Sequence, residues 1–202
     1  MVTLTLYDAA GSSNALKARF LLELLGLSYE KVEIPFERPR PDWYVAIHPL
    51  ATIPALRDGD AVIGESNAIL RYLAGREGRG DLYPGDPLAR AHVDWVMDTW
   101  SMHLRPVAIQ VEMPALFGPE PDAEKAAAAL PAYVAVLERV EQLVRGDGTM
   151  CAGGLTIADA CAAPTLYRAA KLDLPWGRLP RLAAVRDTVL AHPAFSAAGA
   201  VR

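Results

Sequence analysis

The chain has 202 residues, of which 52% are hydrophobic and 22% are charged, and its formal net charge is −4. This composition predicts a packed globular protein with one large or two small domains, and the acidic balance disfavours nucleic acid as the main partner. The sequence contains no apolar run of membrane-spanning length, and its first residues do not resemble a signal peptide. Cys151 and Cys161 match no metal-binding spacing, so we expect reduced, buried thiols in a cytoplasmic protein.

The first 77 residues predict an alternation of strands and helices. In chain order we expect a strand ending near Tyr7, a helix over 13–25, a strand around Val32 and Ile34, a proline-rich irregular stretch from Pro35, a hairpin over 53–63 and a helix beginning at Ser66. Alternating apolar and polar residues indicate the strands, Gly26 marks the end of the first helix, and Asp58-Gly59 is typical of a hairpin turn. The β-α-β order predicts that the first two strands are parallel.

The remainder of the chain predicts helices only. Residues 75–87 hold four glycines and two prolines, which is typical of a linker. We therefore expect a domain over residues 1–77, a linker over 78–87 and an all-helical domain over 88–202. Its helices are expected at 88–117, 122–145, 156–171 and 180–191. Thr156 and Asp159 form a capping-box pattern that predicts the start of the third of these helices.

Five short stretches, in order along almost the whole chain, carry a resemblance to a known family. They are Gly11-Ser12-Ser13-Asn14, His48 through Leu56, Gly64 through Ile69, Leu155 through Ala160, and His192 through Phe195. Each stretch alone is a weak signal, but their order and spacing together resemble the glutathione transferase superfamily. The resemblance implies an α/β, thioredoxin-like N-terminal domain followed by an all-helical C-terminal domain, with glutathione as co-substrate and a homodimer as the assembly.

The turn before the first helix is where the resemblance places the glutathione sulfur. The thiolate is the nucleophile, and a free thiol with a pKa near 8.5 is only about 3% ionised at pH 7. A hydroxyl donor stabilises the anion by about 1.5–3 kcal/mol, and a helix N-terminus adds about 0.3–1 kcal/mol. Ser12 matches the serine of serine-type transferases and is expected to donate to the sulfur. Asn14, Ser13 and Tyr7 are alternatives for this contact, and a simple capping role for Ser12 is the structural alternative.

Two further motifs are expected to hold the peptide part of glutathione. Ile53-Pro54 resembles the family's cis-proline turn, which would present the backbone N–H and C=O of Ile53 to the cysteinyl residue of the ligand. Glu65 and Ser66 resemble the clamp for the γ-glutamyl end, where Glu65 takes the ammonium and Ser66 takes the carboxylate. The alternatives are a plain helix cap for Ser66 and a solvated acid for Glu65.

The glycine end of the site departs from the family pattern. Many relatives carry a lysine, or a histidine–threonine pair, just before Ile-Pro, whereas this chain has Ala51-Thr52. Thr52 matches the threonine, and His48, Arg40 and Arg38 are the candidates for contacting the glycine carboxylate. Weak binding of glutathione, or a preference for another thiol, is therefore an open alternative.

The resemblance places the second substrate against the first long helix of the helical domain. Trp100, His103 and Arg105 are the candidates for this electrophile pocket. Apolar residues at helical spacing more often form a core than a pocket, and polar residues more often form a solvated or ion-paired face. No metal is expected, so the chemistry would rest on glutathione and a small hydrophobic electrophile.

These expectations point first to a glutathione transferase, which adds the thiolate to an electrophilic carbon and can also reduce a peroxide. The second reading is a glutathione-dependent isomerase or dehalogenase. The Ser12-Ser13 turn is similar to that of maleylacetoacetate isomerases, although Asn14 stands where they have cysteine. The third reading is a non-catalytic binding or regulatory protein with the same fold. Thiol–disulfide exchange is disfavoured because residues 12–15 contain no cysteine.

Overall fold

The computed structural model describes residues 3–117 and 120–199, which form two compact units. The first unit consists of residues 3–79 together with 192–199, and the second is Gly80–Ala191. The predicted combination of a thioredoxin-like domain and an all-helical domain is confirmed. The expected division placed 88–202 in the helical domain, whereas the structure groups 192–199 with the first unit. Within the described ranges, every helix is too short or too polar to traverse a bilayer.

The first unit contains a four-stranded sheet and four helices among its described residues. These elements are β1 (Leu4–Asp8), α1 (Ser13–Leu24), β2 (Tyr29–Glu33), α2 (Asp42–Ile47), β3 (Ala55–Asp58), β4 (Ala61–Ile63), α3 (Ser66–Arg76) and α9 (Pro193–Ala197). The sheet order is β2-β1-β3-β4. β1 and β2 are parallel, as predicted, while β3 is antiparallel to both β1 and β4.

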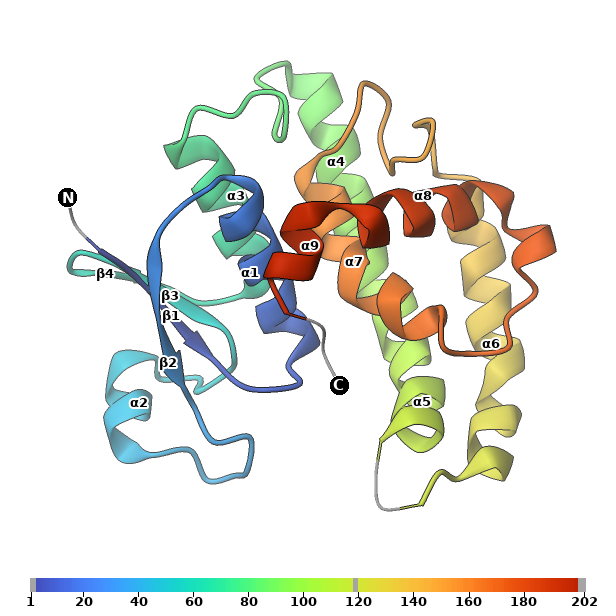
Figure 1. The fold of residues 1–202 in the computed structure, drawn as a ribbon, viewed down its shortest axis with the longest axis horizontal. Coiled ribbons are helices and arrows are strands. Elements are labelled where there is room, and N and C mark those ends of the chain that lie inside the picture. The colour runs from blue at the N-terminus through green and yellow to red at the C-terminus, as the bar shows by residue number, and fades with distance from the viewer. Residues whose placement is uncertain (1–2, 118–119, 200–202) are drawn as a thin grey trace. The chain divides into compact units, whose positions relative to one another are not determined.

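The two faces of the sheet are covered by different helices (Figure 1). Side chains alternate along a strand, so Leu6 and Tyr7 point to opposite faces, and both are buried. Tyr7 packs on Tyr44 of α2, with ring centroids 5.6 Å apart. α1 and α3 pack against each other on the other side of the sheet. Helix α2 lies within the stretch that the sequence predicts to be irregular. The sequence does not predict this helix because its six residues are too few to show helical periodicity.

The end of the chain packs on the first helix. Phe195 of α9 meets Phe20 of α1 edge to face, with ring centroids 5.4 Å apart. His192 caps α9 by accepting the backbone N–H of Ala194 on Nδ1, and its ring also lies 5.9 Å from Phe20. These contacts explain why residues 192–199 belong to the first unit, although the sequence places them after the helical run.

The second unit is a bundle of helices around one central helix. Its elements are α4 (Pro87–Thr99), a π-helical turn η1 (Trp100–Leu104), α5 (Arg105–Leu116), α6 (Ala123–Glu141), α7 (Ile157–Ala169), a short 3₁₀ turn η2 (Trp176–Arg178) and α8 (Pro180–Ala191). Every residue of α7 except Tyr167 is buried, which is typical of a helix that is apolar on all sides. The predicted capping box at Thr156 and Asp159 is confirmed at its start.

The long helix expected over 88–117 is interrupted at its middle by the π-helical turn. The backbone N–H of Arg105 donates to the carbonyl of Trp100, five residues earlier, instead of the usual four. Pro106 follows directly and has no N–H to donate, and a proline ring clashes with the carbonyl four residues before it. The extra residue in the turn explains why one periodic pattern yields α4 and α5 as separate helices.

The capping box gives the second unit a pH dependence that can be measured. The Asp159 carboxylate is fully buried and accepts the N–H groups of Met150 at 2.7 Å and Thr156 at 2.8 Å. Burial raises the pKa of Asp159 from 3.8 to about 6, against the lowering effect of these donors. The folded state therefore holds this proton more tightly than the unfolded state does. Its contribution to stability is complete below about pH 4 and is lost as pH rises toward about 6.

We expect this loss to appear as a difference between the wild type and Asp159→Asn. As pH rises through the window between the two pKa values, the free energy of unfolding of the wild type should fall relative to that of the variant. The fall should approach about 3 kcal/mol, because each pKa unit corresponds to about 1.4 kcal/mol. Urea titrations at several pH values measure it. A wild-type advantage that grows as pH rises contradicts the assignment.

Candidate functional site

Three loops that carry the expected thiol-binding residues meet at one edge of the sheet. β1 runs toward this edge and the antiparallel β3 starts there, since Ala55 pairs with Tyr7. β4 ends at the same edge, because Ile63 pairs with Leu56. The turn after β1, the loop before β3 and the start of α3 after β4 therefore lie together, as the strands in Figure 1 show.

The turn after β1 delivers Ser12 to the N-terminus of α1. Gly11 has φ +81°, a conformation that favours glycine, and the backbone N–H of Ser12 donates to Ala9. Ser12 is only 6% exposed, and its Oγ accepts the N–H of Ala15 at 3.2 Å. The capping role is therefore present. A hydroxyl has two acceptor lone pairs and one donor hydrogen, so Ser12 can cap the helix and still donate to a sulfur.

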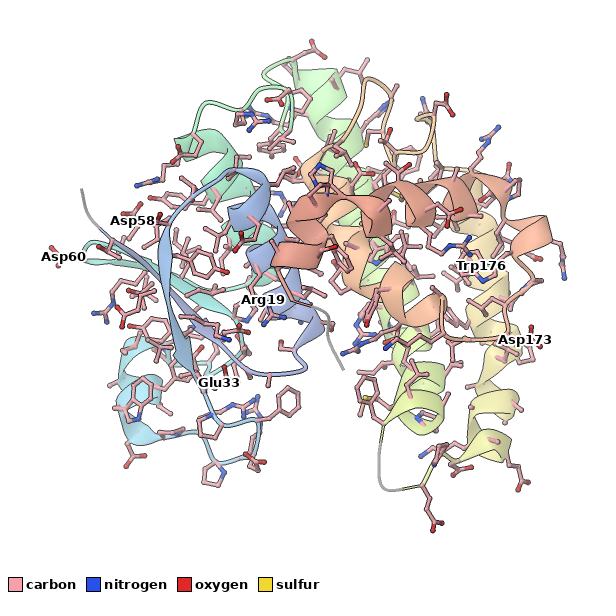
Figure 2. The ribbon with its side chains drawn as sticks, in the orientation of Figure 1. Arg19, Glu33, Asp58, Asp60, Asp173 and Trp176 are labelled. Carbon is pink, nitrogen blue, oxygen red and sulfur yellow. The ribbon has the colours of Figure 1, made fainter. Side chains whose placement is uncertain are left out.

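Charged residues that the motifs do not include hold this turn in place. The fully buried Asp8 carboxylate accepts the N–H of Ala9 at 2.7 Å and the guanidinium of Arg19 at 2.6 Å. Arg19, labelled in Figure 2, thereby ties α1 to the end of β1. The carboxylate of Glu33 at the end of β2, also labelled there, accepts the N–H of Ala10. The sequence does offer a signal for the pair of Arg19 and Asp8. Arg19 lies among apolar residues of α1, and a charged residue in such surroundings predicts a buried partner of opposite charge.

The alternative donors occupy different environments. Ser13 is the first residue of α1 and is buried, whereas Asn14 is exposed in the first turn. Tyr7 is buried on the α2 face of the sheet, in contact with the rings of Trp43 and Tyr44. Tyr7 is therefore a core residue. Ser12, Ser13 and Asn14 remain the candidates at the start of α1.

The loop before β3 contains the predicted cis-proline turn. The Ile53–Pro54 peptide bond is cis. Within the described residues, the backbone N–H and C=O of Ile53 have no hydrogen-bond partner. The preceding residue is fixed, because the Tyr44 hydroxyl donates to the carbonyl of Thr52 at 2.6 Å. Burial raises the pKa of Tyr44 to about 12, so this hydroxyl keeps its proton.

The start of α3 combines an exposed carboxylate with a buried hydroxyl. Glu65 occupies the N-cap position with φ +60°, and its side chain is exposed and makes no capping bond. A left-handed conformation at a non-glycine residue costs about 1–3 kcal/mol and persists only where the surroundings impose it. Ser66 follows as the first residue of α3 and is buried. The backbone thus places one carboxylate and one hydroxyl side by side at a helix N-terminus.

A cation that the motifs do not include lies beside Ser66. Lys17 of α1 is buried, and its Nζ is 3.5 Å from Ser66 Oγ and 3.4 Å from Asn67 Oδ1. This contact links the N-terminal halves of α1 and α3 across the site. Sequence alone gives no indication of it, because Lys17 and Ser66 are 49 residues apart.

The candidates for the glycine end are engaged in the protein to different degrees. His48 is buried, and its Nε2 is 2.8 Å from Thr52 Oγ1. The guanidinium of Arg40 donates to the carbonyls of Pro35 and Glu37, the second at 2.8 Å, so it closes its own loop. Arg38 is exposed. The cation of Arg40 is therefore committed to backbone, and this end of the site has weaker support than the other two.

The three electrophile candidates occupy separate positions in the second unit. Trp100 is 1% exposed and donates its indole N–H to Thr165 Oγ1 at 3.3 Å, so its ring belongs to the core of this unit. Arg105 pairs with the buried Glu112 at 2.6 Å. His103 is exposed on the π-helical turn. His103 is therefore the most exposed of the three, whereas the Arg105 side chain is 18% exposed and Trp100 is buried.

A hollow of about 390 Å³ does exist within the second unit, away from these candidates. Its lining includes His92, Trp95, Arg145, Met150 and Cys151. Burial raises the pKa of Cys151 to about 11, so its thiol is protonated at neutral pH and a poor nucleophile. Cys151 and Cys161 are both buried. Among the described residues, no group of three or more histidine, cysteine or acidic side chains is placed to hold a metal.

Comparison with known proteins relates both units of the chain to glutathione S-transferases. Residues 2–75 match the glutathione S-transferase N-terminal domain, and residues 104–193 match the glutathione S-transferase C-terminal domain. The maleylacetoacetate isomerase of Pseudomonas aeruginosa is 31% identical over 198 residues, which cover 94% of this chain and 92% of the isomerase. Glutathione S-transferase 3 of Zea mays is 31% identical, with coverage of 96% and 92%.

A solved structure agrees with these relatives. The theta class glutathione S-transferase of Xanthomonas axonopodis pv. citri, solved with glutathione bound, superimposes with a TM-score of 0.88 at 28% identity. The match covers 98% of this chain and 97% of that protein. With the family models and the full-length relatives, it shows that this chain belongs to the glutathione S-transferase superfamily.

Proposed function

We propose that this protein binds glutathione at the sheet edge formed by β1, β3 and β4 and activates its thiol for attack on a small electrophile. The observation that carries the proposal is the convergence of Ser12, the cis Ile53–Pro54 bond and Glu65-Ser66 at that edge. These groups suit the γ-glutamyl residue, the cysteinyl backbone and the thiol of γ-glutamyl-cysteinyl-glycine, and they leave its glycine residue without an assigned partner. The bound glutathione in the Xanthomonas relative supports the same ligand.

The proposed chemistry needs a hydrogen-bond donor at the sulfur and no base from the protein. The Ser12 hydroxyl and the first N–H groups of α1 favour the thiolate over the thiol, so the proton leaves to solvent. The backbone of Ile53 pairs with the cysteinyl residue and fixes the sulfur near Ser12. The thiolate then attacks an electrophilic carbon and displaces a leaving group. With a peroxide it attacks one oxygen and the O–O bond breaks, which releases an alcohol and gives glutathione sulfenic acid. A second glutathione then converts the sulfenic acid to the disulfide with loss of water.

The Glu65 carboxylate is proposed to bind the γ-glutamyl ammonium, and its removal gives a direct test. Glu65→Gln should weaken glutathione binding by about 10- to 100-fold, because a hydrogen bond to a charged group contributes about 1.5–3 kcal/mol. Calorimetric titration measures the change. Glu30→Gln, on an exposed residue of β2, is the matched control and should leave the affinity unchanged. Equal affinities for Glu65→Gln and the wild type rule out this role.

A second candidate function is glutathione-dependent cis–trans isomerisation. The isomerase of Pseudomonas aeruginosa favours it, as does the Ser12-Ser13 turn. In that reaction the thiolate adds reversibly to a conjugated double bond, the bond rotates, and the thiolate leaves with no net change in atoms. Both candidates use the same activated thiolate, so they differ only in the second substrate.

Two assays with purified protein separate these functions. Transferase activity predicts turnover of a chromogenic aryl halide that depends on glutathione. Isomerase activity predicts conversion of maleylacetoacetate with glutathione unconsumed. Binding of glutathione with neither turnover favours a binding or regulatory protein. We further propose a homodimer and a cytoplasmic setting, as is usual in the family.

A further inference from the structure

Lys17 is a buried cation whose charge is not matched by the protein. It is 4% exposed, on a helix whose neighbouring residues are apolar. Its Nζ approaches two neutral oxygens, Ser66 Oγ at 3.5 Å and Asn67 Oδ1 at 3.4 Å, which are both at the long end of hydrogen-bond distances. Among the described residues, no carboxylate lies within ion-pair distance of Nζ.

The other buried cation of α1 shows the usual arrangement. Arg19, two residues further along, pairs with the buried Asp8 carboxylate at 2.6 Å. Taking a charge out of water is costly unless an opposite charge and hydrogen bonds compensate for it. The fold supplies this compensation for Arg19 but gives Lys17 only two weak neutral acceptors. The missing anion is therefore expected from outside the chain.

The place for that anion is the N-terminus of α3. Helix α3 has 11 residues, and the first N–H groups of a helix lack partners within it and carry a partial positive charge. The Ser66 hydroxyl lies at this terminus, and Lys17 Nζ is 3.5 Å from its Oγ. A carboxylate bound to Ser66 would face the helix N-terminus and the ammonium of Lys17 together.

We propose that Lys17 supplies the positive charge that binds the α-carboxylate of the γ-glutamyl group. This inference rests on the proposed binding of glutathione and adds a residue to it. Glu65 binds the ammonium of the same amino acid, so one charged side chain of the protein pairs with each charge of that zwitterion. Recognition is then strongest at the γ-glutamyl end, in keeping with the weak support for a cation at the glycine end.

The test uses two ligands and four forms of the full chain. The ligands are glutathione and its decarboxylated analogue, in which a γ-aminobutyryl group replaces γ-glutamyl and only the α-carboxylate is lost. The proteins are the wild type, Lys17→Met, Lys17→Arg and the control Lys31→Met, whose lysine is half-exposed on β2. Affinities come from calorimetric titration. Thermal unfolding checks that Lys17→Met, an apolar chain of similar length, keeps the fold.

The result expected is a loss that depends on the carboxylate. Lys17→Met should bind glutathione about 10- to 100-fold more weakly than the wild type, while both bind the decarboxylated analogue equally weakly. Lys17→Arg should retain most of the affinity for glutathione, and Lys31→Met should retain all of it.

Two results overturn the inference while leaving glutathione binding intact. One is unchanged glutathione affinity in Lys17→Met. The other is an equal loss for both ligands, which would show that Lys17 only supports the local structure. If Lys17→Met does not fold, Lys17→Gln answers the same question with the same two ligands. If the wild type binds no glutathione, the proposed function fails, and this inference fails with it.

Discussion

Replacing Ser12 with alanine should raise the thiol pKa of bound glutathione by about 1–2 pH units and lower the turnover of an aryl halide at neutral pH by about 10- to 100-fold. The hydroxyl is proposed to donate to the thiolate, and such a charge-assisted bond contributes about 1.5–3 kcal/mol. The affinity for glutathione should change little, because the γ-glutamyl and cysteinyl contacts remain. The ultraviolet absorbance of the thiolate, followed as a function of pH, measures the pKa directly.

The capping role of Ser12 requires a second variant. Because Ser12 Oγ accepts the N–H of Ala15, Ser12→Ala also removes a helix cap, at a cost of about 1 kcal/mol in stability. Glycine at an N-cap costs only a few tenths of a kcal/mol, so Ser12→Gly separates the two effects. Both variants should lose thiolate stabilisation equally. If Ser12→Gly keeps a wild-type pKa for the bound thiol, the donor is Asn14 or Ser13.

Replacing Glu112 with glutamine should lower the free energy of unfolding by about 3–5 kcal/mol. Glu112 is fully buried in the second unit, and its Oε2 accepts Arg105 at 2.6 Å and Arg168 at 3.1 Å. Removing one partner of a buried ion pair leaves the other charge uncompensated, and here two guanidinium groups would lose their counter-ion. Urea-induced unfolding at neutral pH measures the loss.

The matched control is the exposed pair of Arg186 and Asp187, whose side chains are 2.8 Å apart. Asp187→Asn should cost less than about 1 kcal/mol, because exposed ion pairs contribute little. Replacing all three members of the buried cluster with apolar residues of similar size should recover most of the stability lost in Glu112→Gln. A loss for Glu112→Gln no larger than that for Asp187→Asn contradicts the account of this cluster.

Much of the fold could be predicted from local patterns. Alternation predicts β1, the Asp58-Gly59 turn predicts the hairpin, and the capping box predicts the start of α7. These signals are confirmed because each depends on residues that lie next to one another in the chain. The two features not predicted, α2 and the π-helical turn, have other causes. The first is too short to show a period, and the second follows from a single proline without an N–H.

Some residues of the candidate site could likewise be predicted from local patterns, and others could not. Ser12, Ile53-Pro54 and Glu65-Ser66 could be located because each belongs to a short motif. Lys17 could not, because its significance comes from a contact with a residue 49 positions away. Trp100 is predicted as a pocket residue, but its ring is buried. The sequence could not decide this, because an apolar residue at helical spacing can belong either to a core or to a pocket.

The central claim is that glutathione binds and loses its thiol proton beside Ser12, and calorimetric titration at pH 7 in buffers of different ionisation enthalpy tests both parts. The wild type should bind glutathione with a Kd of about 1 mM or tighter. Most of one proton should be released on binding, since the free thiol is protonated at that pH. Ser12→Ala should bind with similar affinity and release much less. No heat of binding at about 10 mM glutathione, or binding by the wild type without proton release, would contradict the claim.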